Sequence, residues 1–175
     1  IPRNALSGRI ARVLGCILPP VKPALVVHGG CGTPPPGEEA ERNEACERSA
    51  DAGWRVLQGG GSALDAAEAV VRALEDEPLL NAGTGAYLQA DGVARLDASI
   101  MAGDGRAGAV AQVPLLPHPV SLARYLLEQD AHALLAGPEA LTLAARLGHV
   151  AHRLFRRRPQ DDRAISGRLH AGRAA

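Results

Sequence analysis

Two glycine-rich loops hold the residues of this 175-residue chain whose types and spacing could do chemistry. The first follows an apolar run and reads His28-Gly29-Gly30-Cys31-Gly32. The backbone amides of such a loop can hold a phosphate when a helix begins directly after it. Here the prolines at 34 to 36 intervene and no G-x-G-x-x-G pattern is completed, which disfavours nucleotide binding. A tight turn, in which glycine permits positive φ, explains the cluster more simply.

His28 stands where the apolar run meets this loop. An imidazole in that place can be a general base, a metal ligand or a hydrogen-bonded core residue. No partner for the first two roles lies nearby in the sequence, so the core role is favoured.

The second loop runs from Leu74 to Gly85 and begins with three consecutive acids, Glu75, Asp76 and Glu77. They end a predicted helix, where the helix dipole is already negative, so the acids need a cation or a basic partner nearby. Backbone carbonyls of the loop could hold a hard cation. A solvated acidic helix end explains the spacing equally well. Asn81, inside the glycine turn, is either a local turn former or a side chain directed at a ligand.

Composition limits the class of protein. Hydrophobic residues make up 46% and charged residues 22% of the chain, as in a globular domain. Aromatic residues make up 2%, and Lys+Arg equals Asp+Glu at 19 each, so neither stacking nor net charge favours nucleic acid or a membrane. No apolar run approaches the roughly 20 residues of a membrane span. The three cysteines form no CxxC pair, which favours a reducing, cytoplasmic setting.

Apolar periodicity predicts the elements of the first half. Residues 23–28 are a short apolar run with a β-branched pair and predict a buried strand. Residues 38–58 predict a helix that ends at the three glycines 59–61. Ser62 and Asp65 form a capping box for a second helix that runs to Pro78. Its apolar stripe is Leu64, Ala67, Val71 and Leu74.

The pattern of the second half changes to strands. Residues 85–101 predict a hairpin that turns at 90–92, and residues 107–113 predict a third strand. Pro119 and Pro138 open two helices that continue to about residues 129 and 147. Because βαβ alternation is missing, this order predicts an α+β fold with helices layered on a largely antiparallel or mixed sheet.

The strand residues also predict an uncovered apolar face. Successive side chains of a strand point to opposite faces of a sheet. By that rule the apolar strand residues should not all face one layer of helices, and a partner or self-association should cover the second face. These residues are Leu88, Leu96, Ile100, Val110 and Val113.

Charge separates the ends of the chain from its body. Residues 1–22 are expected to be an extension without an assigned role, and residues 23–150 the folded body. From Arg153 onward the sequence has seven arginines against two aspartates and no apolar periodicity. This pattern predicts that residues 151–175 are a disordered or aberrant Arg-rich tail.

Between about Ala24 and Gly148 the chain contains, in order, VVHGGCGT, GGSALDAAEAVVRALEDEPLLNAGTGAYLQADG, LDASIM, RAGAVAQV and HPVSLARYLLEQDAHALLAGPEA. Together these blocks resemble the plant-type L-asparaginase/isoaspartyl peptidase family of N-terminal nucleophile (Ntn) hydrolases. The resemblance implies an αββα sandwich, of which this chain holds the N-terminal half, made as a precursor that cuts itself into α and β chains. It also implies hydrolysis of the β-amide of L-asparagine, or of the isopeptide bond of β-aspartyl peptides, by the N-terminal Thr of the β chain.

Several site residues follow from the resemblance alone. The family's HGG loop corresponds to His28, Gly29 and Gly30, beside the scissile bond, and Asn81 corresponds to the asparagine of the NAG turn, which helps order the site. Ala102 replaces the second Asp of the family's DASIMDG segment, which puts the contact of that carboxylate in doubt. The resemblance further implies no cofactor other than a structural sodium ion. Its ligands would be the main-chain carbonyls of Leu74, Glu75, Glu77, Leu80, Ala82 and Thr84.

The sequence departs from the family at the nucleophile. Its threonines are Thr33, Thr84 and Thr142, and the G-T-V-G-like segment of the family does not occur. Cleavage before Thr33 or Thr84 would sever a block that the fold needs. The chain is therefore expected to be the α region from a truncated or frameshifted gene, without a catalytic residue and inactive unless a β chain joins it. The alternative is a noncatalytic remnant or interaction protein that keeps the half-fold.

Overall fold

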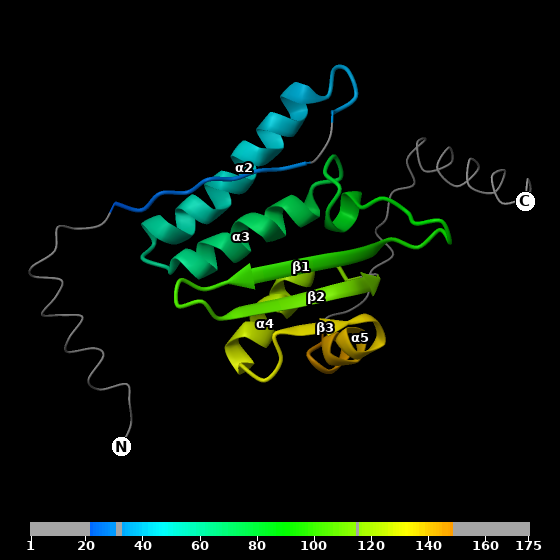
Figure 1. Cartoon of the computed structure of the whole chain (residues 1–175). Coiled ribbons are helices and arrows are strands. Elements are labelled where there is room, and N and C mark those ends of the chain that lie inside the picture. Colours follow the sequence, from blue (N-terminus) through cyan, green and yellow to red (C-terminus); the bar gives the residue numbers. More distant parts are fainter. Residues whose placement is uncertain (1–21, 31–32, 115, 149–175) are drawn as a thin grey trace, which may run out of the picture.

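A computed structural model of the chain describes residues 22–30, 33–114 and 116–148 (Figure 1). The predicted Arg-rich tail (residues 151–175) and the predicted extension, except for Lys22, lie outside these described residues. The elements, in chain order, are α2 (Glu39–Gln58), α3 (Ala63–Asp76), the 3-10 turn η1 (Gly83–Gly85), β1 (Arg95–Met101), β2 (Ala107–Pro114), α4 (Pro119–Gln129), β3 (Leu134–Ala136) and α5 (Gly137–Arg146).

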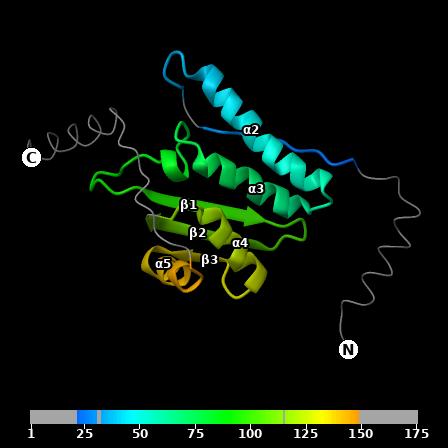
Figure 2. The same cartoon turned by 180° about the vertical axis from the view of Figure 1, so that it is seen from behind.

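The three strands form one mixed sheet in the order β1-β2-β3. β1 is antiparallel to β2, and β2 is parallel to β3. Helix α4 lies behind β1 and β2 in Figure 1 and in front of them in Figure 2, so it covers one face of the sheet. Helices α2 and α3 pack on each other on the side of β1. This arrangement agrees with the predicted α+β class.

The main core lies between α4 and the sheet. Its centre is formed by Leu122, Ala123 and Leu127 of α4 against Val110 and Val113 of β2, all 3% exposed or less. Gly108 lets the helix come close, because a Cβ at this position would overlap the carbonyl oxygen of Ala123. Helix α5 adds Ala140 and Ala144 to the same cluster.

A β-bulge overturns the prediction that the apolar strand residues face both sides of the sheet. Leu96 pairs with Val113 and Ala98 pairs with Val110, so β2 carries one extra residue between the two pairs. Gln112 lies in this bulge with a φ of 56°, and its N–H donates to Oδ1 of Asp97 at 2.7 Å.

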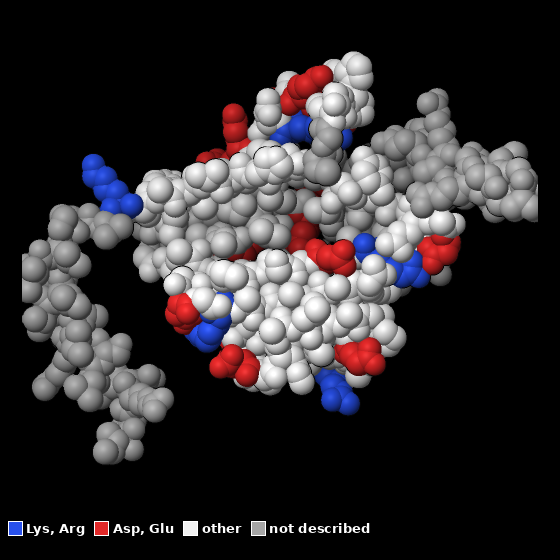
Figure 3. Space-filling model, viewed as in Figure 1, with Lys and Arg blue, Asp and Glu red and all other residues white. Residues whose placement is uncertain are grey.

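Because the bulge shifts the alternation by one residue, Val110 and Val113 both point toward the helices. Leu96 and Ile100 lie on the same face and are 5% and 7% exposed. The opposite, open face carries Arg95, Asp97, Ser99, Met101, Ala107 and Ala109. Apart from Met101, which is 67% exposed, its side chains are polar or small, and Figure 3 shows few charged atoms over it.

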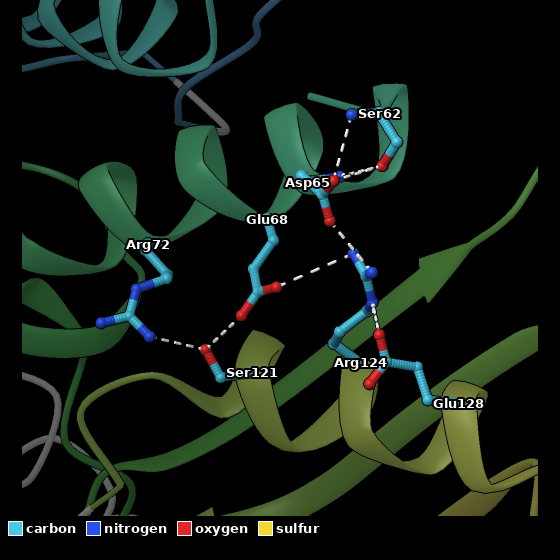
Figure 4. A network of polar contacts seen from close by, with 7 residues as sticks. All are labelled: Ser62, Asp65, Glu68, Arg72, Ser121, Arg124 and Glu128. Atoms are coloured by element: carbon cyan, nitrogen blue, oxygen red, sulfur yellow. Dashed lines mark hydrogen bonds and ion pairs between the residues drawn. The ribbon is translucent and has the colours of Figure 1, made fainter. Parts of the chain in front are cut away.

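Helices α3 and α4 are joined by a polar network on their exposed side (Figure 4). The hydroxyl of Ser121 accepts from Arg72 Nη1 at 2.8 Å and donates to Glu68 Oε1 at 2.7 Å. Arg124 Nη2 lies 3.0 Å from Oδ1 of Asp65. Since Asp65 also forms the predicted capping box with Ser62, the residue that starts α3 ties it to α4 as well.

The predicted helices are confirmed closely, since α2, α3, α4 and α5 begin within one residue of the expected positions. Buried positions of α3 are Ala66, Val70 and Glu75, however, and the predicted stripe is only half-buried. The stripe faces the apolar groove beneath residues 25–28 and the edge of the core rather than the core centre.

Two predicted strands are wrong. Residues 22–30 are extended but belong to no strand, and no backbone hydrogen bond joins them to another described residue. Val26 in this segment is 95% exposed. The first arm of the predicted hairpin is also no strand, because Gly83–Gly85 forms η1 and the chain then runs to Gln89 without joining the sheet. The turn itself is present, since Gln89 N–H donates to the carbonyl of Val93 at 3.0 Å.

Strand β3 was not predicted. It has three residues and pairs in parallel with Ala109–Ala111, a contact that its own sequence does not signal. None of the helices in the described part combines the length and the apolar character needed to cross a membrane.

The close approach at Gly108 predicts a strong effect of the smallest substitution. Gly108→Ala is expected to lower the free energy of unfolding by about 1–3 kcal/mol, because α4 must move to admit the methyl group. Gly103→Ala is the matched control, since nothing lies within 4 Å of a Cβ there. Urea unfolding of both variants measures the difference. Equal stability of the two variants would contradict the packing of α4 on β2.

Candidate functional site

The first glycine loop lines a cavity of about 620 Å³. His28 is exposed at this cavity, so the interpretation of His28 as a core residue is wrong. Gly30 has a φ of +92°, which favours glycine. A Cβ at Gly29 would lie 2.6 Å from the Sγ atom of Cys46, so the loop also packs tightly on α2. The glycines therefore serve both a turn and a close approach of the backbone to α2.

The far wall of this cavity comes from the start of α2. Arg42, Asn43 and Glu39 line it together with Thr33. Arg42 donates through Nη2 to Oε2 of Glu38 at 2.8 Å, and its side chain is 17% exposed. The arginine is thus paired with the carboxylate of the residue that precedes α2, and Glu39 adds a second carboxylate to the cavity wall.

The second loop forms a separate, neighbouring cavity of about 380 Å³. Its walls are the NAG turn (Asn81, Ala82 and Gly83), the last turn of α3 and the residues 95–99 of β1. Figure 3 shows a hollow with acidic atoms between the helices and the sheet. Glu75 and Asp97 are the acids that line this cavity.

Asn81 is a local turn former, the first of the two roles considered for it. Its Oδ1 accepts the backbone N–H of Tyr87 at 2.9 Å, which closes the loop around η1. The residue also lines the second cavity. Gly83 has a φ of +44° and packs so closely on the carbonyl of Glu75 that a Cβ would overlap it. The NAG turn is therefore fixed to the end of α3.

Tyr87 was not singled out from the sequence, although it is one of only two tyrosines and lies four residues after the NAG turn. It lines both cavities and is the one residue shared by their described walls. The structure thus brings the HGG loop and Asn81 to two adjacent cavities separated by Tyr87. The three threonines are dispersed: Thr33 lies in the first cavity, Thr84 in η1 and Thr142 in α5.

The three acids that end α3 have different surroundings. Glu75 is only 3% exposed, so the interpretation of a solvated acidic helix end is wrong for this residue. Its Oε1 accepts the N–H of Val120 at 3.2 Å and its Oε2 lies 3.3 Å from Nδ1 of His118. Glu77 pairs with Arg48 at 2.9 Å, and Asp76 Oδ1 lies 3.5 Å from Nε2 of His118.

These contacts supply the basic partners that the helix dipole requires. The N–H of Val120 belongs to the first turn of α4, where the dipole is positive. Burial nevertheless raises the pKa of Glu75 to about 8, and the hydrogen bond from Val120 offsets only part of that rise.

The six carbonyls implied as sodium ligands lie along one continuous loop. The carbonyls of Leu74, Glu77 and Ala82 each accept one backbone N–H, from Glu77, Leu80 and Gly85 respectively. A carbonyl oxygen has two lone pairs, so these bonds leave capacity for a hard cation. Within residues 22–30, 33–114 and 116–148 no group of three His, Cys, Asp or Glu side chains could hold a metal ion. A cation in this loop would therefore depend on main-chain oxygens.

Ala102 lies in the turn between β1 and β2, where its N–H donates to the carbonyl of Arg106 at 2.9 Å. Its methyl group packs against the main core, and it lines neither cavity.

The raised pKa of Glu75 predicts a pH-dependent stability. A carboxyl whose pKa rises from its ordinary 4.5 to about 8 on folding binds its proton more tightly in the folded state. Its stabilising contribution is complete below pH 4.5 and is lost as the pH rises through 8. Glu75→Gln should therefore flatten the decline in stability between these values, as measured by urea unfolding midpoints. Glu47→Gln, at an exposed position of α2, should keep the decline; an unchanged slope in Glu75→Gln would contradict the assignment.

Comparison with known proteins identifies several relatives. The human isoaspartyl peptidase/L-asparaginase is 42% identical over 130 residues, which are 73% of this chain and 42% of that protein. The plant-type L-asparaginase of Thermococcus kodakarensis is 46% identical over 127 residues, which are 71% of this chain and 41% of that protein. The isoaspartyl peptidase/L-asparaginase of Mus musculus is 39% identical over 142 residues, 77% of this chain and 44% of that protein.

The chain thus spans about two-fifths of the length of these curated relatives. A sequence model of the asparaginase family matches residues 21–155, and this stretch contains both glycine loops, both cavities and every helix and strand described above. The resemblance found in the sequence blocks is therefore confirmed: the chain belongs to the asparaginase family.

Proposed function

We propose that this chain is the α portion of an isoaspartyl peptidase or L-asparaginase. In the complete enzyme, the β-amide of L-asparagine or the isopeptide bond of a β-aspartyl peptide is hydrolysed. The observation that carries the proposal is the meeting of His28, Gly29 and Gly30 with Asn81 at two adjacent cavities that share Tyr87. These loops are 51 residues apart in the sequence, since 81 − 30 = 51, and come together only through the fold.

The proposed nucleophile is the N-terminal Thr of a β portion. A terminal Thr can use its own α-amine, directly or through water, as the base that activates its hydroxyl. Donors that stabilise the tetrahedral oxyanion complete the reaction. The part played by this chain is to shape the site: the HGG backbone lies beside the scissile bond, and Asn81 holds the loop next to it.

Residues 22–30 support the docking of such a β portion. Their backbone is extended and forms no backbone hydrogen bond with another described residue. An apolar groove of about 180 Å³ lies between Leu25, Val27 and the α3 residues Ala67, Val70 and Leu74. Unpaired strand-like backbone beside an apolar groove is suited to strand addition from another segment. We infer that the β portion pairs here and completes an αββα sandwich, and that without it the chain self-associates.

A structural sodium ion is part of the same proposal. The loop from Leu74 to Thr84 would hold it through main-chain carbonyls, and the fixed contact of Gly83 with Glu75 keeps the loop in shape. The ion would stiffen the turn that carries Asn81.

The first test of the function is reconstitution. This chain alone is expected to hydrolyse neither L-asparagine nor a β-aspartyl dipeptide, and co-expression with the β portion of a plant-type relative should give both a stable complex and hydrolysis. A β portion whose N-terminal Thr is replaced by Ala is the control, which should bind without activity. Hydrolysis by the chain alone, copurifying with it, would contradict the proposal. A complex without activity would favour the noncatalytic alternative.

The sodium ion is tested by thermal unfolding in sodium chloride and in tetramethylammonium chloride at equal ionic strength. Tm should be higher in sodium, because an ion bound only by the folded loop stabilises it. The same Tm in both salts would argue against a bound ion.

A further inference from the structure

Tyr87 stands between the two cavities of the site. The cavity beside the HGG loop measures about 620 Å³ and the one beside Asn81 about 380 Å³. Tyr87 alone, among the described residues, lines both, and its side chain is 43% exposed. A ligand that extends from one cavity toward the other must pass this residue.

The position of Tyr87 is fixed by its backbone on both sides. Its N–H donates to Oδ1 of Asn81 at 2.9 Å, and the preceding residue, Ala86, donates its N–H to the carbonyl of Gly83 at 3.2 Å. Two residues later, Gln89 is held by the turn to Val93. A partly exposed ring on an anchored backbone loses little conformational freedom when it binds a ligand, which favours its use in recognition.

The larger cavity is far too large for the smaller of the two leaving groups. Hydrolysis of asparagine releases ammonia, which is about as large as a water molecule, roughly 30 Å³ of liquid. Hydrolysis of a β-aspartyl peptide releases an amino acid or peptide, and cavities of some 300–1,000 Å³ are of the size that encloses such ligands. Thr33 and Asn43 give this cavity neutral polar walls for a peptide group, and the same wall carries Glu39 and the Arg42 that pairs with Glu38.

We propose that Tyr87 and the cavity beside the HGG loop form the subsite for the leaving group of β-aspartyl peptides, and that the Tyr87 ring favours peptides whose leaving residue is aromatic. This inference rests on the proposed function and names the substrate class of that same site. The leaving group of asparagine is ammonia, which does not reach the ring, so Tyr87 should not contribute to the binding of asparagine.

The test uses this chain assembled with its β portion and two substrates, β-aspartyl-phenylalanine and L-asparagine. Tyr87→Ala should lower the ratio of kcat/KM for the dipeptide to kcat/KM for asparagine by about tenfold, mainly through KM, because an aromatic contact is lost. Tyr87→Phe keeps the ring and should restore the ratio. Tyr125→Phe, at the tyrosine that packs on the main core, is the matched control and should leave the ratio unchanged.

A ratio that stays constant in Tyr87→Ala, or that falls equally in Tyr87→Phe, would overturn the subsite. If the wild-type complex hydrolyses neither substrate, the proposed function is wrong, and the subsite is then tested by binding alone. With only two tyrosines in the chain, the ring resonances of Tyr87 can be assigned by comparison with Tyr87→Phe. Their shift on titration with β-aspartyl-phenylalanine, but not with asparagine, would support the subsite, and no shift would contradict it.

Discussion

The last turn of α3 is the joint on which the rest of the molecule depends, and Glu75 forms it. The side chain of this residue accepts from the first turn of α4, while its main-chain carbonyl lies against Gly83. One residue thus fixes the helix that covers the sheet and the turn that carries Asn81. A buried carboxyl is costly unless its oxygens are hydrogen-bonded. Loss of the contact with α4 would therefore leave the buried Glu75 carboxyl without its backbone donor.

The two cavities follow from this joint. With the NAG turn held against α3, the chain from Ala86 to Gln89 must run outward between the HGG loop and β1, which places Tyr87 in both walls. The charges around the joint are locally balanced: Glu77 meets Arg48, and Arg42 meets Glu38. Polar groups without a large net charge suit a zwitterionic amino acid or peptide better than a polyanion.

The parts of the fold that could be predicted are those determined by neighbouring residues. Ser62 and Asp65 form a capping box within four residues, and Pro119 marks a first helical turn by its own geometry. The bulge at Gln112 depends on a carboxylate 15 residues away, and β3 depends on pairing with β2, so neither leaves a local signal. Residues 23–28 have the composition of a strand, but strand formation requires a partner that none of the described residues provides.

The same limit applies to the site. The two loops could be located because glycine and clustered acids are unusual locally, whereas the burial of Glu75 and the position of Tyr87 arise from contacts between distant segments. The family resemblance identified which loops matter. It carried no information about Tyr87, because the ring acquires its place only when both cavities exist.

The backbone of residues 22–30, which bonds to no other backbone group of the described residues, has a consequence for the synthesis of the protein. An extended edge without backbone partners pairs readily with other chains, so in the proposed enzyme a newly made α portion is exposed to chaperone capture and aggregation as well as to correct docking. Aggregation grows with protein concentration, whereas docking of two halves joined in one polypeptide does not, since each half sees the other at an effective concentration on the order of millimolar. In the proposed enzyme, a precursor that is cleaved only after folding would therefore shield this edge while it is most exposed.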